Sequence, residues 1–294
     1  MRTYLDCVPC FIRQTLDALR LVSADEAVAE RALRRVLQEA AGMRMDRSPP
    51  FMGRELHRVI REVTGRPDPY AEIKRRSTDT ALGLADDVSK RIADSGNSFA
   101  AAVRFAIAGN VMDFAIASLW DGGRIQSCIE EAPAKPLDLE EMAALERAVA
   151  VADSILYLGD NAGETVFDRL LIEQMPRGRV TYVVKGSPVI NDANLADAEA
   201  AGLQRVARII DNGSDAPGTI LELCRPEFRV RFEEADVVVA KGQANYETLC
   251  DADRPVFFLT QIKCHILATS LTGEVGDWVV TRNHGARPVC GKGI

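Results

Sequence analysis

A cluster of acidic, amide and glycine residues follows a short apolar run near the middle of the chain. The run ILYL at 155–158 is followed directly by GDNAGE at 159–164. A dinucleotide-binding turn would carry the pattern GxGxxG at such a place, because glycines let the backbone approach a pyrophosphate. Carboxylate and amide oxygens suit a hard divalent cation instead. Asp160 and Asn161 are therefore candidate metal ligands, and the alternative is that they form a helix N-cap and a turn.

Polar residues also follow four later strand-like runs. These residues are Lys185, the segment DNGSD at 211–215, Lys241 with Asn245, and Lys263. Carboxylates hold a divalent cation, whereas lysines neutralise an anionic ligand, and a metal with a phosphate is the simplest ligand that needs both. Lys185 and Lys241 each follow an apolar strand and precede a glycine, which favours an inward-facing ammonium group over a solvated loop residue.

Asp192 belongs to the stretch that opens the next predicted helix, at 192–203. Taken alone, an acid in that position is more often a helix cap than a metal ligand. It becomes a candidate ligand because a neighbouring strand end carries Asp160.

Two further groups have less specific spacing. Asn110 and Asp113 lie three apart on an alanine-rich helix at 98–119, where polar side chains either bond a neighbouring backbone or line a pocket. Cys7 and Cys10 have the spacing of half a zinc site or of a redox pair, but no second CxxC is present. Cys264-His265 or Cys290 could complete a zinc site in space, but a pair of buried, reduced thiols is the favoured interpretation of Cys7 and Cys10.

The elements that position these residues change in type near residue 150. Residues 1–150 read as mostly helical, with apolar residues recurring three and four apart. Residues 151–294 alternate strand-like and helical runs, with strands expected at 155–158, 179–184, 206–210, 236–240, 256–259 and 278–281 and a long helical stretch at 221–235. This alternation predicts an α/β fold with a mostly parallel, doubly wound sheet. Right-handed crossovers would bring the carboxyl ends of the parallel strands to one edge.

Composition narrows the functional classes. The chain has 294 residues and a net charge of −7, which argues against a nucleic-acid-binding surface. No apolar run approaches the ~20 residues needed to span a bilayer, and the first ten residues lack the apolar core of a secretion signal. Seven scattered cysteines indicate a reducing compartment, so we expect a cytoplasmic protein.

Several motifs occur together and in a characteristic order. They are CVPC at 7–10, AGNVMDF at 108–114, GDNAGE at 159–164, KGSPVINDA at 185–193, DNGSDAPGT at 211–219, KGQANYETL at 241–249 and Lys263-Cys264. In this set the chain resembles the damage-control phosphatase family, metal-dependent phosphatases formerly catalogued as a domain of unknown function. The CxxC is similar to that of the prokaryotic subfamily.

The resemblance implies a Rossmann-like α/β/α sandwich with a helical N-terminal region. It further implies one divalent cation (manganese, nickel, cobalt or magnesium) held by Asp160, Asn161 and Asp192, with a phosphate near Lys263. The implied substrates are small phosphomonoesters, namely sugar phosphates and damaged or side-product metabolites.

In the resulting hypothesis, water attacks the phosphorus with help from the cation, and Lys263 offsets charge on the phosphoryl oxygens. Glu164 and Asp215 are candidate general bases on position alone. If residues 1–150 form a lid, Asn110 and Asp113 face the organic part of the substrate. The residues expected to bind substrate are Asn110, Asp113, Glu164, Lys185, Lys241 and Asn245.

Three other functions fit parts of the pattern. ILYLGDNAGE is similar to the opening of an S-adenosylmethionine site, although Asp160 would oppose the carboxylate tail of that cofactor. A non-catalytic protein that binds phosphorylated metabolites would use the same sheet edge. A structural zinc protein would be built on Cys7 and Cys10. The sequence predicts no particular oligomeric state.

Overall fold

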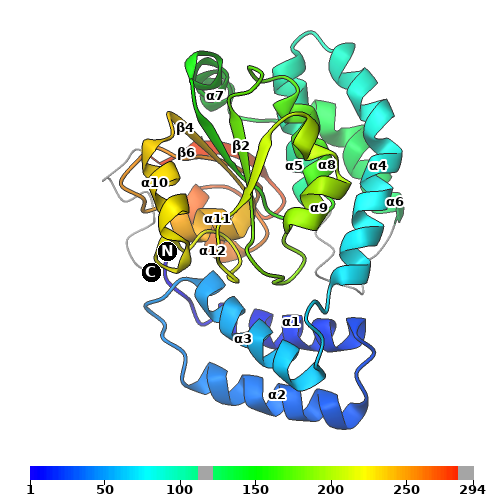
Figure 1. Ribbon diagram of the computed structural model, residues 1–294, viewed down its shortest axis with the longest axis vertical. Helices are drawn as coiled ribbons and strands as arrows, with labels where there is room; N and C mark the ends of the chain where they lie inside the picture. The colour runs from blue at the N-terminus through cyan, green and yellow to red at the C-terminus, as the bar shows by residue number, and fades with distance from the viewer. Residues whose placement is uncertain (112–121, 284–294) are drawn as a thin grey trace.

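The computed structural model describes residues 1–111 and 122–283. In this part of the chain six strands form one sheet with the order β3-β2-β1-β4-β5-β6 (Figure 1). The strands are β1 (Ile155–Leu158), β2 (Val180–Val184), β3 (Arg208–Asp211), β4 (Val237–Lys241), β5 (Phe257–Gln261) and β6 (Trp278–Arg282). Strands β1 to β5 are parallel, and β6 is antiparallel to β5. The predicted mostly parallel sheet is therefore confirmed.

The order of the strands creates a crevice. From β1 the chain proceeds through β2 and β3 toward one edge of the sheet, then returns to place β4 on the other side of β1. The helices that follow β1 and β4 leave the sheet in opposite directions at this switch point, and ligands of such folds bind at the carboxyl ends of those strands. The predicted metal ligands follow β1.

Both faces of the central strands are covered, as expected for parallel strands. All residues of β1 and β4 are buried. Side chains alternate between the faces, so Ile155 and Tyr157 enter one apolar core while Leu156 and Leu158 enter the other. Helices α5 (Ser98–Val111), α8 (Thr165–Ile172) and α9 (Leu195–Ala200) pack in the first core, and α10 (Pro226–Glu234), α11 (Gly242–Leu249) and α12 (His265–Leu271) in the second.

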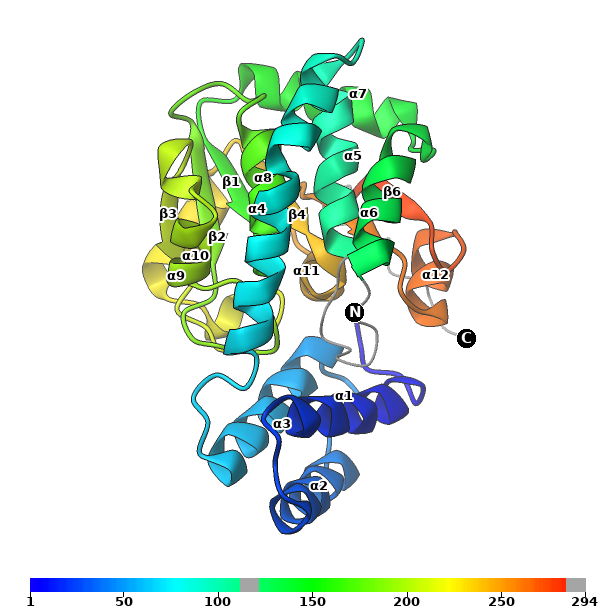
Figure 2. The same cartoon turned by 90° about the vertical axis from the view of Figure 1, so that its right-hand side faces the viewer.

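The helical N-terminal half forms two parts. Helices α1 (Cys7–Leu21), α2 (Glu26–Ala41) and α3 (Pro49–Thr64) share a small core of their own and lie apart from the sheet, at the bottom of Figures 1 and 2. Helices α4 (Ala71–Ala93) and α5 instead contact α8 beside the sheet, and α6 (Gly122–Glu131) and α7 (Leu139–Val151) follow on the same side. The helices before residue 150 therefore contribute to the layer that covers the sheet as well as to a separate unit.

One predicted helix is wrong in extent. The stretch 221–235 is a short 3-10 turn, η4 (Leu221–Leu223), followed by α10, which begins at Pro226. Proline is favoured in the first turn of a helix but has no N–H to continue one, so the helix starts at this residue. Among the described residues, no helix is both long enough and apolar enough to cross a membrane.

The helix after β2 is capped by Asn194. Its Oδ1 accepts hydrogen bonds from the backbone N–H groups of Ala196 and Asp197, and the Asp197 carboxylate accepts one from the N–H of Asn194. Asp192 lies two residues earlier and does not cap the helix. The helix-cap interpretation of Asp192 is therefore wrong.

Replacing this cap should measurably weaken the protein. Asn194→Ala leaves the first N–H groups of α9 without their acceptor, so we expect the free energy of unfolding to fall by about 1 kcal/mol. Urea denaturation measures the change. An unaltered midpoint in Asn194→Ala would contradict the assignment of the cap.

Candidate active site

The loop after β2 folds back onto the end of β1. Asn161 and Asp192 form an isolated antiparallel bridge, and the N–H of Ala193 donates to the carbonyl of Asp160 at 2.8 Å. Asp160, Asn161 and Asp192 are each 6% exposed or less. Helix α8 starts only at Thr165, so neither Asp160 nor Asn161 caps it. The three predicted metal ligands are thus brought together in a buried place at the switch point.

Two side-chain amides join Asp160 to Glu164. The Nδ2 of Asn110, from α5, donates to Asp160 Oδ2 at 2.7 Å and to Glu164 Oε2 at 2.8 Å. The Nδ2 of Asn161 donates to the same two oxygens at 3.1 and 3.2 Å. The Oδ1 of Asn110 is buried and has no hydrogen-bond partner among the described residues. The amides hold the carboxylates in place, and the Oδ1 of Asn110 is left to accept a bond from a ligand or water.

Lys241 lies deeper, behind Glu164. Its Nζ donates to Asp168 Oδ1 at 2.6 Å, to the Ala106 carbonyl at 2.9 Å and to Glu164 Oε1 at 3.1 Å. The side chain is fully buried, and these acceptors engage the three N–H groups of the ammonium. Burial by itself lowers the pKa of Lys241, but the charges of Asp168 and Glu164 outweigh it and raise that pKa overall. This placement differs from the expectation that Lys241 meets a phosphate, because the lysine neutralises acids inside the fold.

Sequence reasoning missed the other partners of Asp168. Tyr157 and Tyr182 donate to its two carboxylate oxygens at 2.8 and 2.7 Å, and their rings stack with centroids 5.3 Å apart. The two tyrosines face each other in register on β1 and β2. Two sequence signals point to this group: Asp168 follows Glu164 by four residues, one helical turn, and each tyrosine lies in a strand that is otherwise mostly aliphatic.

Lys185 and Lys263 are the lysines nearest the predicted metal ligands. Lys185 Nζ lies 3.4 Å from Asp192 Oδ2 and donates to the Gly218 carbonyl at 2.5 Å. Lys263 follows β5, is half-buried, and lowers the pKa of Asp160 by its charge. The charges of both lysines therefore act on Asp160.

The site carries an excess of buried negative charge. Burial raises the pKa of Asp160 well above its usual value, and the charges of Glu164 and Asp192 raise it further against the opposing lysines. Burial also raises the pKa of Glu164, with Lys241 opposing. A divalent cation would offset this excess, and carboxylate with amide oxygens is a donor set that suits a hard cation. Over residues 1–111 and 122–283 no three His, Cys, Asp or Glu side chains form a ready metal cluster, so the fit depends on the amide of Asn161.

Gly242 allows the start of α11 to approach Asp160 closely. It has φ +80°, and a Cβ at this position would lie 1.8 Å from Asp160 Oδ2. Only a residue without a side chain permits this approach of α11 to Asp160.

Asn245 is fully buried one turn into α11. Its Nδ2 donates to the carbonyls of Lys241 and Gly159 at 2.7 and 3.2 Å, and its Oδ1 accepts from Thr219 at 2.7 Å. These bonds tie the ends of β1 and β4 together, which differs from the expected contact with substrate. Asp113 lies outside the described residues.

The candidate general bases have contrasting surroundings. Three arginines of α3 bind Asp215, and although partial burial raises the pKa of this carboxyl, bonds from Arg58 and Arg54 lower it overall. A carboxylate held in this way is a poor base. Glu164 remains beside the ligand cluster.

The CxxC thiols lie in α1. Cys7 and Cys10 are free, and burial raises the pKa of the Cys7 thiol to about 11. A thiol with so high a pKa is a weak nucleophile at neutral pH. Cys7 is half-buried and Cys10 is exposed, so the predicted burial of the pair is wrong.

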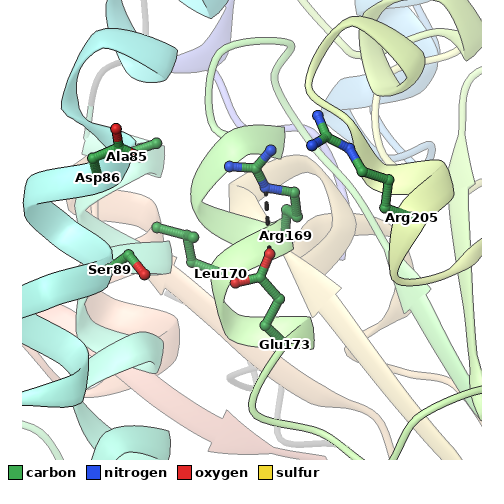
Figure 3. A pocket seen from close by; sticks show the side chains of 7 residues that line it. All are labelled: Ala85, Asp86, Ser89, Arg169, Leu170, Glu173 and Arg205. Atoms are coloured by element: carbon green, nitrogen blue, oxygen red, sulfur yellow. Dashed lines mark ion pairs between the residues drawn. The ribbon is translucent and has the colours of Figure 1, made fainter.

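A separate cavity of about 210 Å³ lies between α4, α8 and the 3-10 turn η3 (Leu203–Arg205) (Figure 3). It is lined by Ala85, Asp86, Ser89, Arg169, Leu170, Glu173 and Arg205. None of the predicted site residues belongs to it, and Arg169 and Glu173, one turn apart at the end of α8, form an ion pair of 3.7 Å along one wall of it.

Comparison with known proteins agrees with the motifs. Residues 3–279 match the damage-control phosphatase ARMT1-like domain. The chain belongs to this family. The family resemblance of the sequence is therefore confirmed.

Relatives of the family cover almost the whole chain. The damage-control phosphatase PH1575 of Pyrococcus horikoshii is 31% identical, over 96% of this chain and 99% of that protein. A damage-control phosphatase of Archaeoglobus fulgidus is 30% identical, over 93% and 96%. An uncharacterised protein of Methanocaldococcus jannaschii is 33% identical, over 94% of each chain. The crystal structure of a DUF89 family protein from P. horikoshii matches the fold with a TM-score of 0.87 at 30% identity, over 96% of this chain and 99% of that one.

Removing the buried ammonium group of Lys241 should destabilise the protein strongly. Lys241→Met leaves Asp168 and Glu164 buried without their ammonium partner, and we expect the free energy of unfolding to fall by about 3–5 kcal/mol. Chemical denaturation measures the loss, and Lys90→Met, at an exposed position of α4, serves as control with a change within about 0.5 kcal/mol. Equal stabilities of the two variants would contradict the buried network.

Glu247 of α11 should make stability depend on pH. Burial raises its pKa to about 7, against the hydrogen bond from Gln243 at 2.6 Å. The folded protein therefore keeps a proton that the unfolded chain releases near pH 4.5, and the stabilisation is lost as pH rises to about 7. Between pH 5 and pH 8 the stability of the wild type should fall by about 2.5 kcal/mol more than that of Glu247→Gln, measured by chemical denaturation at the two pH values. Parallel pH profiles for the two proteins would disprove the raised pKa.

Proposed function

We propose that this chain is a metal-dependent phosphatase that hydrolyses small phosphomonoesters, such as sugar phosphates or phosphorylated side products of metabolism. Family membership and the names of two relatives support the phosphatase activity. The observation that carries the proposal is the buried excess of carboxylates at the switch point, with Lys185 and Lys263 beside it. A divalent ion would offset the excess negative charge of the acids, and the two lysines would pair with an anion bound to that ion.

Asp160, Asn161 and Asp192 would hold one divalent ion, with manganese, nickel, cobalt and magnesium as the candidates. Such an ion, when bound, polarises a phosphoryl oxygen and lowers the pKa of a water molecule. An amide between two carboxylates keeps the site less negative than three carboxylates would. That difference eases the approach of a dianionic phosphate.

The remaining residues orient the metal ligands and neutralise the charge of the phosphate. Lys263 and Lys185 pair with the phosphoryl oxygens and offset their charge as the leaving alkoxide departs. Asn110 keeps Asp160 in position through its Nδ2 and can accept a hydrogen bond from the ligand at Oδ1. Glu164 holds both amides, so it fixes the ligand geometry from behind.

The methyltransferase alternative is disfavoured. The carboxylates of Asp160 and Glu164 occupy the turn after β1, where the carboxylate tail of S-adenosylmethionine would have to approach. The carboxylates of the turn would repel the carboxylate of the cofactor. A non-catalytic binding protein remains as an outcome of the assay below, because it would bind a phosphorylated ligand without turnover.

The direct test is release of inorganic phosphate from a panel of phosphomonoesters, run in parallel with Mn²⁺, Ni²⁺, Co²⁺ and Mg²⁺. We expect the wild type to be active only with a divalent ion. Asp192→Ala should lower kcat/KM by at least about a hundredfold, because it removes a ligand while the bridge to Asn161 is made by the backbone.

The matched control is Asp87→Ala, which removes an exposed acid of α4 and should leave kcat/KM unchanged. Circular dichroism checks that all variants are folded. Full activity of Asp192→Ala at saturating metal would refute the proposed ligand set.

A further inference from the structure

One face of α3 presents three arginines to a single carboxylate. Arg54, Arg58 and Arg61 are spaced by four and three residues, so they share a helix face. The Nε atoms of Arg54 and Arg58 lie 2.5 and 2.7 Å from the Asp215 carboxylate, and Arg61 Nη2 lies at 3.3 Å. We call these three residues the arginine face.

The arginine face carries more charge than its neighbours neutralise. Asp215 supplies one negative charge, and Glu55 supplies another through its 2.8 Å ion pair with Arg54. The charge of Glu62 also acts on Arg58, but Glu62 is paired with Arg35 at 3.0 Å, so among these residues four guanidinium groups face three carboxylates and one positive charge remains. The Arg58 side chain is 41% exposed, so its guanidinium is reachable from solvent, while Arg54 and Arg61 are more deeply set. In a chain of net charge −7, such a local positive excess favours an anion.

The arginine face adjoins both loops that border the candidate active site. Arg61 Nη1 donates to the carbonyl of Pro188, in the loop between Lys185 and Asp192. Asp215 lies in the loop after β3, and that loop reaches Lys185 through the Gly218 carbonyl. Helix α3 also contacts α11, which begins at the end of β4 (Figure 2).

The strand order brings the two bordering loops near each other. Strand β3 lies two positions from β1. Neighbouring strands are about 4.8 Å apart, so the loop after β3 starts about 10 Å from the end of β1. One small molecule with two anionic groups could therefore contact both loops.

We propose that the arginine face binds a second anionic group of the substrate, either a phosphate or a carboxylate, so that the preferred substrates are phosphomonoesters with two anionic ends. This proposal rests on the phosphatase function above. Asp215 occupies the guanidinium groups in the free protein and competes with the incoming anion. Guanidinium groups bind phosphate and carboxylate by paired hydrogen bonds, which gives the geometric selectivity that a lysine lacks.

The competing explanation is a purely structural tie between α3 and the loop after β3. The two explanations predict different signs for the changes in activity of two variants. If the arginines only tie the helix down, Arg58→Gln and Asp215→Asn both loosen the same contact and change activity in the same direction for every substrate. If the arginines bind substrate, Arg58→Gln weakens binding of the second anion, whereas Asp215→Asn removes its competitor and strengthens binding.

The experiment compares kcat/KM for a hexose monophosphate, the corresponding hexose bisphosphate and the phosphate of a sugar acid. For Arg58→Gln we expect a loss of about fivefold with the two doubly anionic substrates and less than about twofold with the monophosphate. For Asp215→Asn we expect a gain of similar size, again confined to the doubly anionic substrates. The sugar-acid phosphate and the bisphosphate distinguish a carboxylate preference from a phosphate preference.

Arg34→Gln is the matched control, because it removes an exposed ion pair with Glu30 that lies within α2 and contacts no residue of the arginine face. It should change no substrate by more than about twofold. Equal effects on single and double anions, or shifts of the same sign in Arg58→Gln and Asp215→Asn, would overturn the proposal while leaving the phosphatase function intact. A wild type that hydrolyses none of the phosphomonoesters would overturn both.

Discussion

Burial of like charges is the constraint on which this structure depends. The carboxylates of Asp160, Glu164, Asp168 and Asp192 all lie below the surface at one edge of the sheet. Each would be costly to bury unpaired, since the low dielectric of the interior strengthens their repulsion. In the described part of the chain, the buried lysines that contact these acids are Lys185, paired with Asp192, and Lys241, paired with Glu164 and Asp168, so four carboxylates face two ammonium groups. The fold therefore keeps an excess of buried negative charge at its switch point.

The cluster is divided into an inner and an outer part. Lys241, with the two stacked tyrosines, satisfies Asp168 and one oxygen of Glu164 inside the sandwich. The amide of Asn110 connects this inner part to Asp160. One negative charge is in excess in each part, since Lys241 faces Glu164 and Asp168 inside and Lys185 faces Asp192 beside Asp160 outside. We place the proposed cation at the outer part, because Asn161 supplies an amide there, next to Asp160 and bridged to Asp192.

Sequence patterns predicted the sheet and the convergence of the site, but not the direction of every polar side chain. Alternation of strands and helices was enough to expect that residues after β1 and β2 meet at one edge, and Asp160, Asn161 and Asp192 do meet. Lys241 and Asn245 follow a strand in the same manner, yet both point inward and bond the interior. A polar residue that follows a strand can be placed at the edge of the sheet from sequence alone. Its hydrogen-bond partners cannot, because they come from helices such as α5 that are distant in the sequence.

A divalent cation is proposed to bind at the outer acids, Asp160 and Asp192. Crystals soaked in Mn²⁺ and measured for anomalous scattering locate such an ion without reference to activity. The account predicts one strong anomalous peak within bonding distance of Asp160, Asn161 and Asp192, absent from crystals of Asp160→Asn treated in the same way. A fully soaked crystal with no peak at these residues, or with its strongest peak at another site, would contradict it.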